Sequence, residues 1–158
     1  HEIFTEMLKI ITTCILALVS LACMNAQTEM AWSTYNIGFV APPTMQTLVD
    51  SKGRFEVSND NVQISIFPWD GRVNFDDLGD GTIDIATQLG YETTGSADAL
   101  ELEDFQGFYV QATKQGVEAI VVLLYNNAGN VTLVADIQYQ PGFINEAMDI
   151  ALSFYATN

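Results

Sequence analysis

Histidine, cysteine and basic residues are scarce in this sequence. Its 158 residues include one His, two Cys and five Lys or Arg against 20 Asp or Glu, so the formal net charge is −15. Proteins bind nucleic acid and anionic lipid through Lys and Arg that neutralise phosphates. We therefore expect no nucleic-acid partner and no direct contact with an anionic membrane. With 49% hydrophobic and 11% aromatic residues, the chain can still bury a core, which excludes intrinsic disorder.

Residues 1–26 have the pattern of upstream residues followed by a secretory signal segment. One positive residue, Lys9, precedes the apolar run 10–22 (IITTCILALVSLA), which is shorter than the ~20 apolar residues that span a bilayer. Two processing sites compete, one before Cys23 and one after Ala26. The first resembles a bacterial lipobox, in which Cys23 would be acylated. We expect an exported protein that is secreted, periplasmic or at the cell surface, and any membrane attachment would be through this lipid anchor.

Removing residues 1–26 also removes every histidine and cysteine. Residues 27–158 keep 18 of the 20 acidic residues and four of the five basic ones, for a net charge of −14. Histidine-based acid–base catalysis, Ser-His-Asp hydrolysis, histidine-bound zinc, thiol nucleophiles and iron–sulfur sites are thereby excluded. The segment 79–81 (GDG) lacks the lysine and the spacing of a phosphate-binding loop. Binding therefore outranks catalysis among the candidate functions.

Residues 27–158 predict a single α+β domain in which a mainly antiparallel β-sheet carries two helices. After a loose lead at 27–31, apolar patterns predict strands at 32–40, 45–50, 54–58, 62–67, 91–94, 100–103, 108–113, 117–125 and 131–139. Apolar residues at helical spacing predict a short middle helix over 82–89 and an amphipathic C-terminal helix over 143–155. The run 119–125 is continuous enough to predict a strand that is buried on both faces.

Several segments of these elements resemble a known fold. They are the strand end at 39–43 (FVAPP), the paired strands within 55–67, the turn into a strand at 106–109 (QGFY) and the closing helix with 152–154 (LSF). Together with the order of elements they resemble the PsbP-like fold, a group that includes extrinsic proteins of the oxygen-evolving complex and bacterial DcrB-type lipoproteins. The resemblance covers most of residues 32–156. It implies a non-enzymatic envelope protein that binds a partner, and it carries over no site residues.

Carboxylates cluster in a glycine-containing segment before the middle helix. Asp76, Asp77 and Asp80 are the candidate ligands of a calcium ion, because calcium prefers several oxygen ligands from flexible loops. The spacing departs from a calcium-binding loop, since Leu78 stands where an oxygen ligand belongs. The alternative interpretation places the same carboxylates before the helix N-terminus, where negative charge complements the helix dipole. Apart from this calcium ion, no cofactor is expected.

Trp69 and Asp70 are the candidate ligand-binding residues. They stand in the loop 68–71 (PWDG), where a large apolar ring is hard to bury, and an exposed indole offers a platform for a protein or glycan partner. The alternative is that Trp69 packs at the edge of the core, as most large aromatic side chains do.

Three functions remain open at this point. The first is a secreted or cell-envelope domain that binds or assembles without catalysis, on a ligand that the sequence does not identify. The second is a carboxylate-dependent hydrolase, which requires two acidic residues facing each other across a cleft. The third is a self-assembling filament or surface-layer subunit, in which an exposed sheet edge pairs with the next copy.

Overall fold

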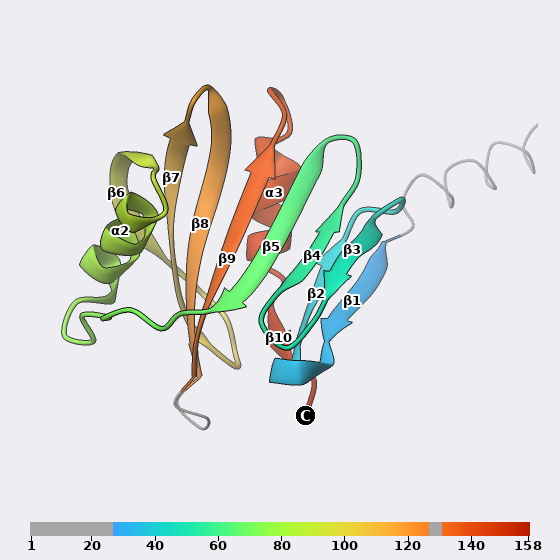
Figure 1. Ribbon diagram of the computed structural model, residues 1–158, viewed down its shortest axis with the longest axis horizontal. Helices are drawn as coiled ribbons and strands as arrows, with labels where there is room; N and C mark the ends of the chain where they lie inside the picture. Colours follow the sequence, from blue (N-terminus) through green and yellow to red (C-terminus); the bar gives the residue numbers. More distant parts are fainter. Residues whose placement is uncertain (1–26, 127–130) are drawn as a thin grey trace, which may run out of the picture.

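A seven-stranded antiparallel sheet forms the centre of the molecule (Figure 1). The structure, a computed structural model, describes residues 27–126 and 131–158. From one edge to the other, the strands are β3 (Gln46–Asp50), β4 (Phe55–Ser58), β5 (Val62–Pro68), β9 (Val131–Tyr139), β8 (Val117–Asn126), β7 (Gln106–Lys114) and β6 (Glu92–Leu100). Every neighbouring pair is antiparallel. The late strand β9 lies between β5 and β8, so it joins two parts of the chain that are separate in sequence.

β8 runs through the buried interior of the sheet. All its side chains from 119 to 124 are at most 1% exposed, which confirms that the continuous apolar run is buried on both faces. Residues 120, 122 and 124 belong to one core cluster, and residues 119, 121 and 123 belong to another. Because side chains alternate between the two faces of a strand, the sheet has an apolar core on each side.

One face of the sheet is covered by a helix and by a second, smaller sheet. The helix α3 (Ile144–Ala151) packs on β8 and β9 and is seen behind the large sheet in Figure 1. The strands β1 (Thr28–Trp32), β2 (Ile37–Ala41) and β10 (Tyr155–Ala156) form a three-stranded antiparallel sheet, and the 3₁₀ turn η1 (Ser33–Tyr35) connects β1 to β2. Helix α3 also contacts β2, so the cover is continuous.

Trp32 at the end of β1 attaches the small sheet to the large one. Its side chain is fully buried, and its ring centroid lies 6.2 Å from that of Phe55 in β4. Its indole N–H donates a hydrogen bond to the carbonyl oxygen of Ser51, just after β3, at 2.8 Å. Phe39 of β2 packs edge-on against the same Phe55 ring, at 6.3 Å. At this junction, aromatic burial and the Trp32–Ser51 hydrogen bond hold the two sheets together.

Helix α2 (Leu78–Gln88) covers only part of the opposite face. It packs against β6, β7 and β8, where Ile85 and Ala86 are fully buried beside Val121. In Figure 1, α2 lies in front of one side of the sheet, whereas β9, β5 and β4 run beside it without a helix in front. We call this uncovered part of the face, formed by β4, β5 and β9, the open sheet face.

The α+β class with a mainly antiparallel sheet is confirmed, and several predicted boundaries are wrong. Residues 27–31 were expected to be a loose lead, but residues 28–31 belong to β1 and pair with β2. Helix α2 begins at Leu78 instead of 82, because Asp77 caps it. Helix α3 ends at Ala151 instead of 155. The chain turns back there, and the Ser153 hydroxyl donates to the carbonyl of Ile150 at 2.8 Å.

Residues 1–26, and with them Cys23, lie outside the described residues. The signal segment and the acylation of Cys23 therefore stay predictions. Within the part of the chain that the structure describes, no helix is long and apolar enough to cross a membrane.

Replacing Trp32 tests how the small sheet is attached. Trp32→Ala is expected to lower the free energy of unfolding by about 3–5 kcal/mol, because it removes a fully buried aromatic ring and leaves a cavity. Trp32→Phe keeps most of the apolar burial but leaves the Ser51 carbonyl without its donor, so a smaller loss of about 1–3 kcal/mol is expected. Urea denaturation followed by circular dichroism measures both losses. Equal losses would contradict the inference that ring burial dominates.

Candidate functional site

The predicted ligand-binding residues Trp69 and Asp70 follow β5 in the segment that leads to α2. The backbone N–H of Trp69 donates to the carbonyl of Thr132 at 3.0 Å, and the ring is half-buried against the core on the α2 side. Gly71 makes room for the ring, since a Cβ there would lie 2.7 Å from the indole nitrogen. That nitrogen is buried without a hydrogen-bond partner among the described residues, whereas Asp70 is exposed. Trp69 is therefore largely a packing residue, and the ligand-binding role of the pair stays a prediction.

The predicted calcium ligands Asp76, Asp77 and Asp80 lie around the start of α2. Asp77 is the N-cap residue, and its carboxylate accepts a hydrogen bond from the backbone N–H of Asp80 at 3.0 Å. The negative charge of Asp77 raises the pKa of the exposed Asp80 carboxyl, with smaller contributions from desolvation, from the side-chain contact with Asp77 and from the charge of Asp84. In the described part of the chain, no three acidic, histidine or cysteine side chains are placed to hold a metal ion. The geometry favours the capping interpretation, and calcium binding gains no support from it.

On the open sheet face, polar side chains from three strands stand side by side. The strand register puts Glu56 of β4 opposite Ser65 of β5, and Ser65 opposite Asp136 of β9. Two residues earlier on β5, Gln63 lies opposite Gln138 of β9 and donates from its side-chain amide to the Glu56 carboxylate. The residues that alternate with these on β5 and β9 belong to the core on the other side of the sheet.

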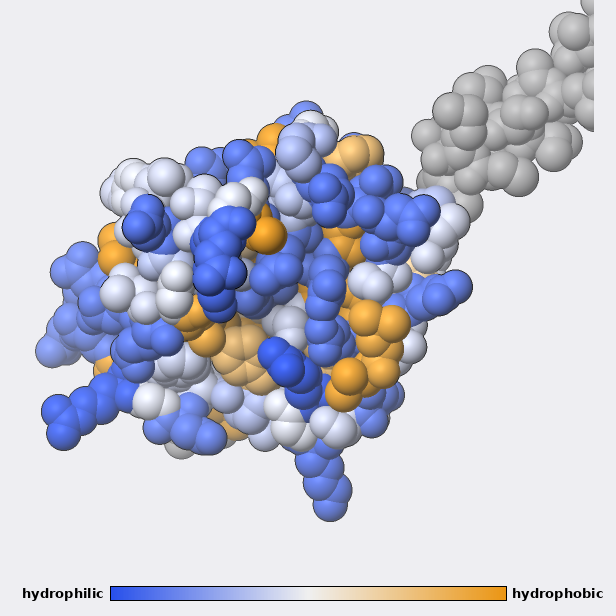
Figure 2. Space-filling model, turned by 45° about the horizontal axis from the view of Figure 1, so that its top comes forward, coloured by the Kyte–Doolittle hydropathy of each residue, from blue (hydrophilic) through white to orange (hydrophobic). Residues whose placement is uncertain are grey.

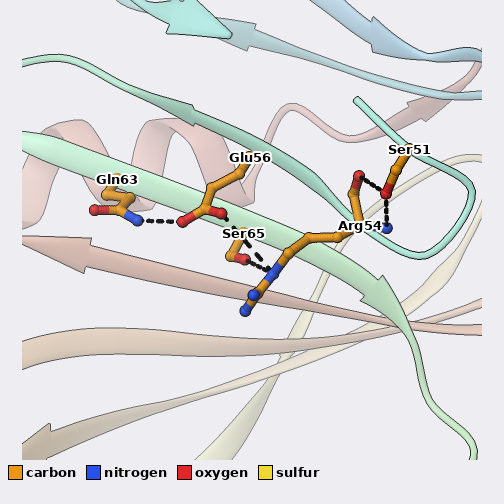
Figure 3. A network of polar contacts seen from close by, with 5 residues as sticks. All are labelled: Ser51, Arg54, Glu56, Gln63 and Ser65. Atoms are coloured by element: carbon orange, nitrogen blue, oxygen red, sulfur yellow. Dashed lines mark hydrogen bonds and ion pairs between the residues drawn. The ribbon is translucent and has the colours of Figure 1, made fainter. Parts of the chain in front are cut away.

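Arg54, just before β4, is held over this face (Figure 3). Its Nε donates to the hydroxyl of Ser65 at 2.9 Å and lies 3.9 Å from Oε2 of Glu56. Its guanidinium carbon lies 5.9 Å from the centroid of the Phe67 ring. The Ser51 hydroxyl accepts a hydrogen bond from the Arg54 backbone N–H at 3.1 Å, which fixes the backbone. The two terminal nitrogens have no partner among the described residues, and the side chain is 54% exposed, so they are available to an incoming acceptor.

Tyr91 joins the end of α2 to the open sheet face. Its hydroxyl lies 2.8 and 2.9 Å from the two carboxylate oxygens of Asp136, and it accepts a hydrogen bond from the side-chain amide of Gln138 at 2.9 Å. The amine of Lys114 lies 5.3 Å from the centroid of the Tyr91 ring and donates to the carbonyl of Leu89 at 2.9 Å. Burial, and then the charge of Asp136, strongly raise the pKa of Tyr91. The phenol therefore stays protonated and acts as a hydrogen-bond donor, not as a base.

Asp136 is the most perturbed carboxylate of this face. Burial raises its pKa, and the hydrogen bond from Tyr91 and the positive charges of Lys114 and Arg54 oppose that shift. A carboxylate in this position is charged at neutral pH only at a cost in folding free energy. Perturbed ionisable groups are concentrated at functional sites, and Asp136, unlike the exposed Asp80, owes its raised pKa chiefly to burial.

The open sheet face offers hydrogen-bond donors and acceptors on a nearly rigid strand surface. A small hollow of about 180 Å³ at one end of β5 and β9 is lined by Asn59–Gln63, Val117 and Gln138–Gln140. In the space-filling view, hydrophilic residues cover most of the visible surface, and apolar residues form separate patches (Figure 2). The arrangement can therefore bind a polar partner surface, and no nucleophile paired with a general base is among its side chains.

Sequence reasoning missed this site. The residues of the site are not adjacent in sequence: they are Arg54, Glu56, Ser65, Tyr91 and Asp136. The sequence does hold one sign of the site. In β5 and β9, polar residues alternate with core residues, which indicates that part of one face of these strands lies outside the apolar core. Only the strand order brings the polar residues of the two strands together.

No protein-family model matches the chain, and no curated protein matches it in sequence. Among solved structures, it is similar to PsbP of the cyanobacterium Synechocystis sp. PCC 6803, with a TM-score of 0.59 and 11% identity over 83% of this chain and 92% of that one. It is also similar to the Ran-binding protein Mog1p of Saccharomyces cerevisiae, with a TM-score of 0.56 and 12% identity over 84% of this chain and 96% of that one. The resemblance to the PsbP-like fold is therefore confirmed at the level of the fold.

A protein from Bacteroides thetaiotaomicron VPI-5482 also matches, at 14% identity and a TM-score of 0.49. The match covers 85% of this chain but 49% of that protein, so the chain spans about half the length of this relative.

Asp77→Ala tests the capping interpretation of the acidic segment. Loss of the cap is expected to lower the free energy of unfolding by about 0.5–2 kcal/mol. Asp76→Ala is the matched control, because Asp76 is exposed and its side chain makes no cap contact, and a change within about 0.5 kcal/mol is expected. Thermal melting measures both variants. If the wild-type midpoint rises when calcium replaces chelator, the carboxylates bind calcium and the capping interpretation is incomplete.

Asp136→Asn tests the cost of the half-buried carboxylate. Because the pKa of Asp136 is raised in the folded state, its charge destabilises the fold above that pKa, and the cost disappears as the pH falls through it. The asparagine variant keeps an acceptor for Tyr91, so its melting midpoint is expected to exceed that of the wild type at neutral pH. The difference should shrink on acidification. Asp60→Asn, an exposed carboxylate in the β4–β5 turn, serves as the control. A lower midpoint for Asp136→Asn at neutral pH would contradict this account.

Proposed function

We propose that the chain is an exported, non-catalytic domain that binds a protein partner through the open sheet face. One observation carries this proposal. Helix α2 leaves β4, β5 and β9 uncovered, and on them the side chains of Arg54 and Asp136 are fixed by neighbours while still reachable from solvent. Fixed side chains lose little conformational entropy on binding, so such a surface is prepared for a partner.

Binding is favoured over catalysis by the chemistry of the residues. Residues 27–158 contain no histidine or cysteine, and the phenol of Tyr91 is held protonated. A carboxylate-dependent hydrolase is the alternative. The acidic residues of the face, Glu56 and Asp136, lie on the same side of the sheet with Ser65 between them, whereas a hydrolase needs two carboxylates that face each other across a cleft.

A protein partner is favoured by the shape and polarity of the surface. A sheet face with fixed donors and acceptors suits the polar contacts of a protein–protein interface. Mog1p, which shares the fold, is named as a Ran-binding protein, and this supports a protein over a glycan as the partner class. Export is part of the proposal because residues 1–26 have the pattern of a secretory signal. The exported chain is either released or held at the membrane by a lipid anchor on Cys23.

Self-assembly is a second candidate, favoured by one edge of the large sheet. β3 pairs only with β4, so its outer edge is unpaired within the described residues. Leu48 on this strand is 55% exposed. An unpaired edge with an exposed apolar side chain can add a strand from another copy. The bulge between Thr47 and Val49 opposes this, since it interrupts the regular ladder.

Site-specific photo-cross-linking in cells that express the full chain tests the proposed function. A photo-reactive phenylalanine analogue at the position of Gln63 is expected to give a protein adduct, because Gln63 lies on the open sheet face. The same analogue at Asp149, an exposed position on α3, is expected to give none. Arg54→Ala should reduce the Gln63 adduct severalfold, while Arg72→Ala, which removes an exposed arginine from the segment before α2, should leave it unchanged.

Adducts are expected in the envelope or secreted fraction. Equal adducts from both positions, or adducts confined to the cytoplasm, would refute the proposal. A carbohydrate adduct would change the partner class to a glycan. An adduct of the chain with itself would support self-assembly instead.

A further inference from the structure

A groove of about 670 Å³ lies at the turn between β6 and β7, away from the open sheet face. It is lined by residues 99–103 and 105–108. Leu100 and Phe105 are buried and belong to the core on the α3 side, and Leu102 packs against that core while half-buried. Phe108 also borders the groove, but its ring turns to the α2 side of the sheet, where a Cβ at Gly79 would lie 3.9 Å from Cδ1 of Phe108. Leu100, Leu102 and Phe105 therefore form the apolar floor of the groove.

The groove is preformed by contacts outside it. The carboxylate of Asp104 accepts a hydrogen bond from the backbone N–H of Ala156 in β10 at 2.8 Å, which ties the β6–β7 turn to the small sheet. Gly107 lets Leu102 lie close against β7, since a Cβ there would stand 2.9 Å from Cδ1 of Leu102. These contacts fix the turn that carries Leu102, the half-buried side chain of the apolar floor.

The rim of the groove carries negative charge without compensation. Glu101 and Glu103 are exposed, and neither has a hydrogen bond or ion pair among the described residues. No lysine or arginine stands among the lining residues. The whole chain has a net charge of −15, so its field also attracts cations. Asp104 does not belong to this free rim, because it is engaged with Ala156.

We propose that this β6–β7 groove binds a protein segment in which a lysine or arginine neighbours an apolar side chain. The apolar side chain lies on Leu102, beside Leu100 and Phe105, and the cationic group reaches Glu101 and Glu103 at the rim. Charge complementarity selects this occupant over a second copy of the chain, because two copies at −15 repel each other. The inference rests on the proposed binding function but concerns a different surface, and it states the chemistry of the partner.

Fluorescence anisotropy with a synthetic peptide tests the groove. The probe is a labelled peptide in which lysines and leucines alternate, and the comparison peptide has glutamate in place of lysine. The full chain is expected to bind only the lysine peptide. Glu101→Gln combined with Glu103→Gln should weaken that binding by about threefold to tenfold, as expected for two exposed charge pairs. Both positions are exposed, so the double variant should fold like the wild type.

The matched control is Asp149→Asn combined with Glu92→Gln. It removes the same charge from exposed positions, on helix α3 and at the start of β6. This control should bind the lysine peptide nearly as well as the wild type. Amide chemical-shift changes should centre on Gly107 and not on Gly53 in the β3–β4 turn.

Three outcomes would overturn the inference. They are equal binding of the two peptides, equal losses in the two double variants, and shift changes remote from Gly107. Any of these would leave the cross-linking test at Gln63 unaffected, so failure of the groove and failure of the open sheet face are distinguishable.

Discussion

The pairing of β9 with β5 on one side and β8 on the other is the constraint on which the rest of the structure depends. It unites the strands before α2 and the strands after it in one sheet. Because side chains alternate along β9, placing Leu133, Ala135 and Ile137 in the core forces Asp136 and Gln138 onto the opposite face. A slip of one residue would bury the carboxylate of Asp136 among apolar side chains. The same register therefore sets both the core and the candidate site.

The open sheet face follows from the size of α2 relative to the sheet. A helix about 10–12 Å across covers only two or three strands that are spaced about 4.8 Å apart. Helix α2 accordingly packs on β6, β7 and β8, while the other face has both α3 and the small sheet to cover it. The chain then turns at Gly90, whose φ of 90° is in the left-handed region, and this brings Tyr91 back to Asp136. The hydrogen bond between Tyr91 and Asp136 thereby links the C-terminal end of α2 to the open sheet face.

Much of the fold could be predicted from local pattern, and the site could not. The alternation at 131–139 and the apolar run at 119–125 predicted the interior strands. A strand buried on one face alternates between apolar and polar residues, and a strand buried on both faces is continuously apolar. Residues 28–31 were missed as part of a strand, because it is their pairing with β2 that orders them. The site could not be predicted from the sequence for the same reason. The charge of Arg54 reaches Asp136 only because β9 lies beside β5, and strand order is a long-range property that no local pattern encodes.

The charge distribution gives the two candidate surfaces different roles. On the open sheet face, Arg54 and Lys114 stand near Asp136 and reduce its negative potential, so that face is suited to a partner surface with mixed donors and acceptors. At the β6–β7 groove, Glu101 and Glu103 have no such counter-charge among the residues that the structure describes. The uncompensated charge of the groove produces a long-range field that attracts a basic partner and raises the rate of encounter. Fixed hydrogen bonds act only at short range and determine the lifetime of the complex. A basic partner would therefore be attracted by the groove side of the molecule, and the fixed polar contacts of the open face would determine how selectively it is held.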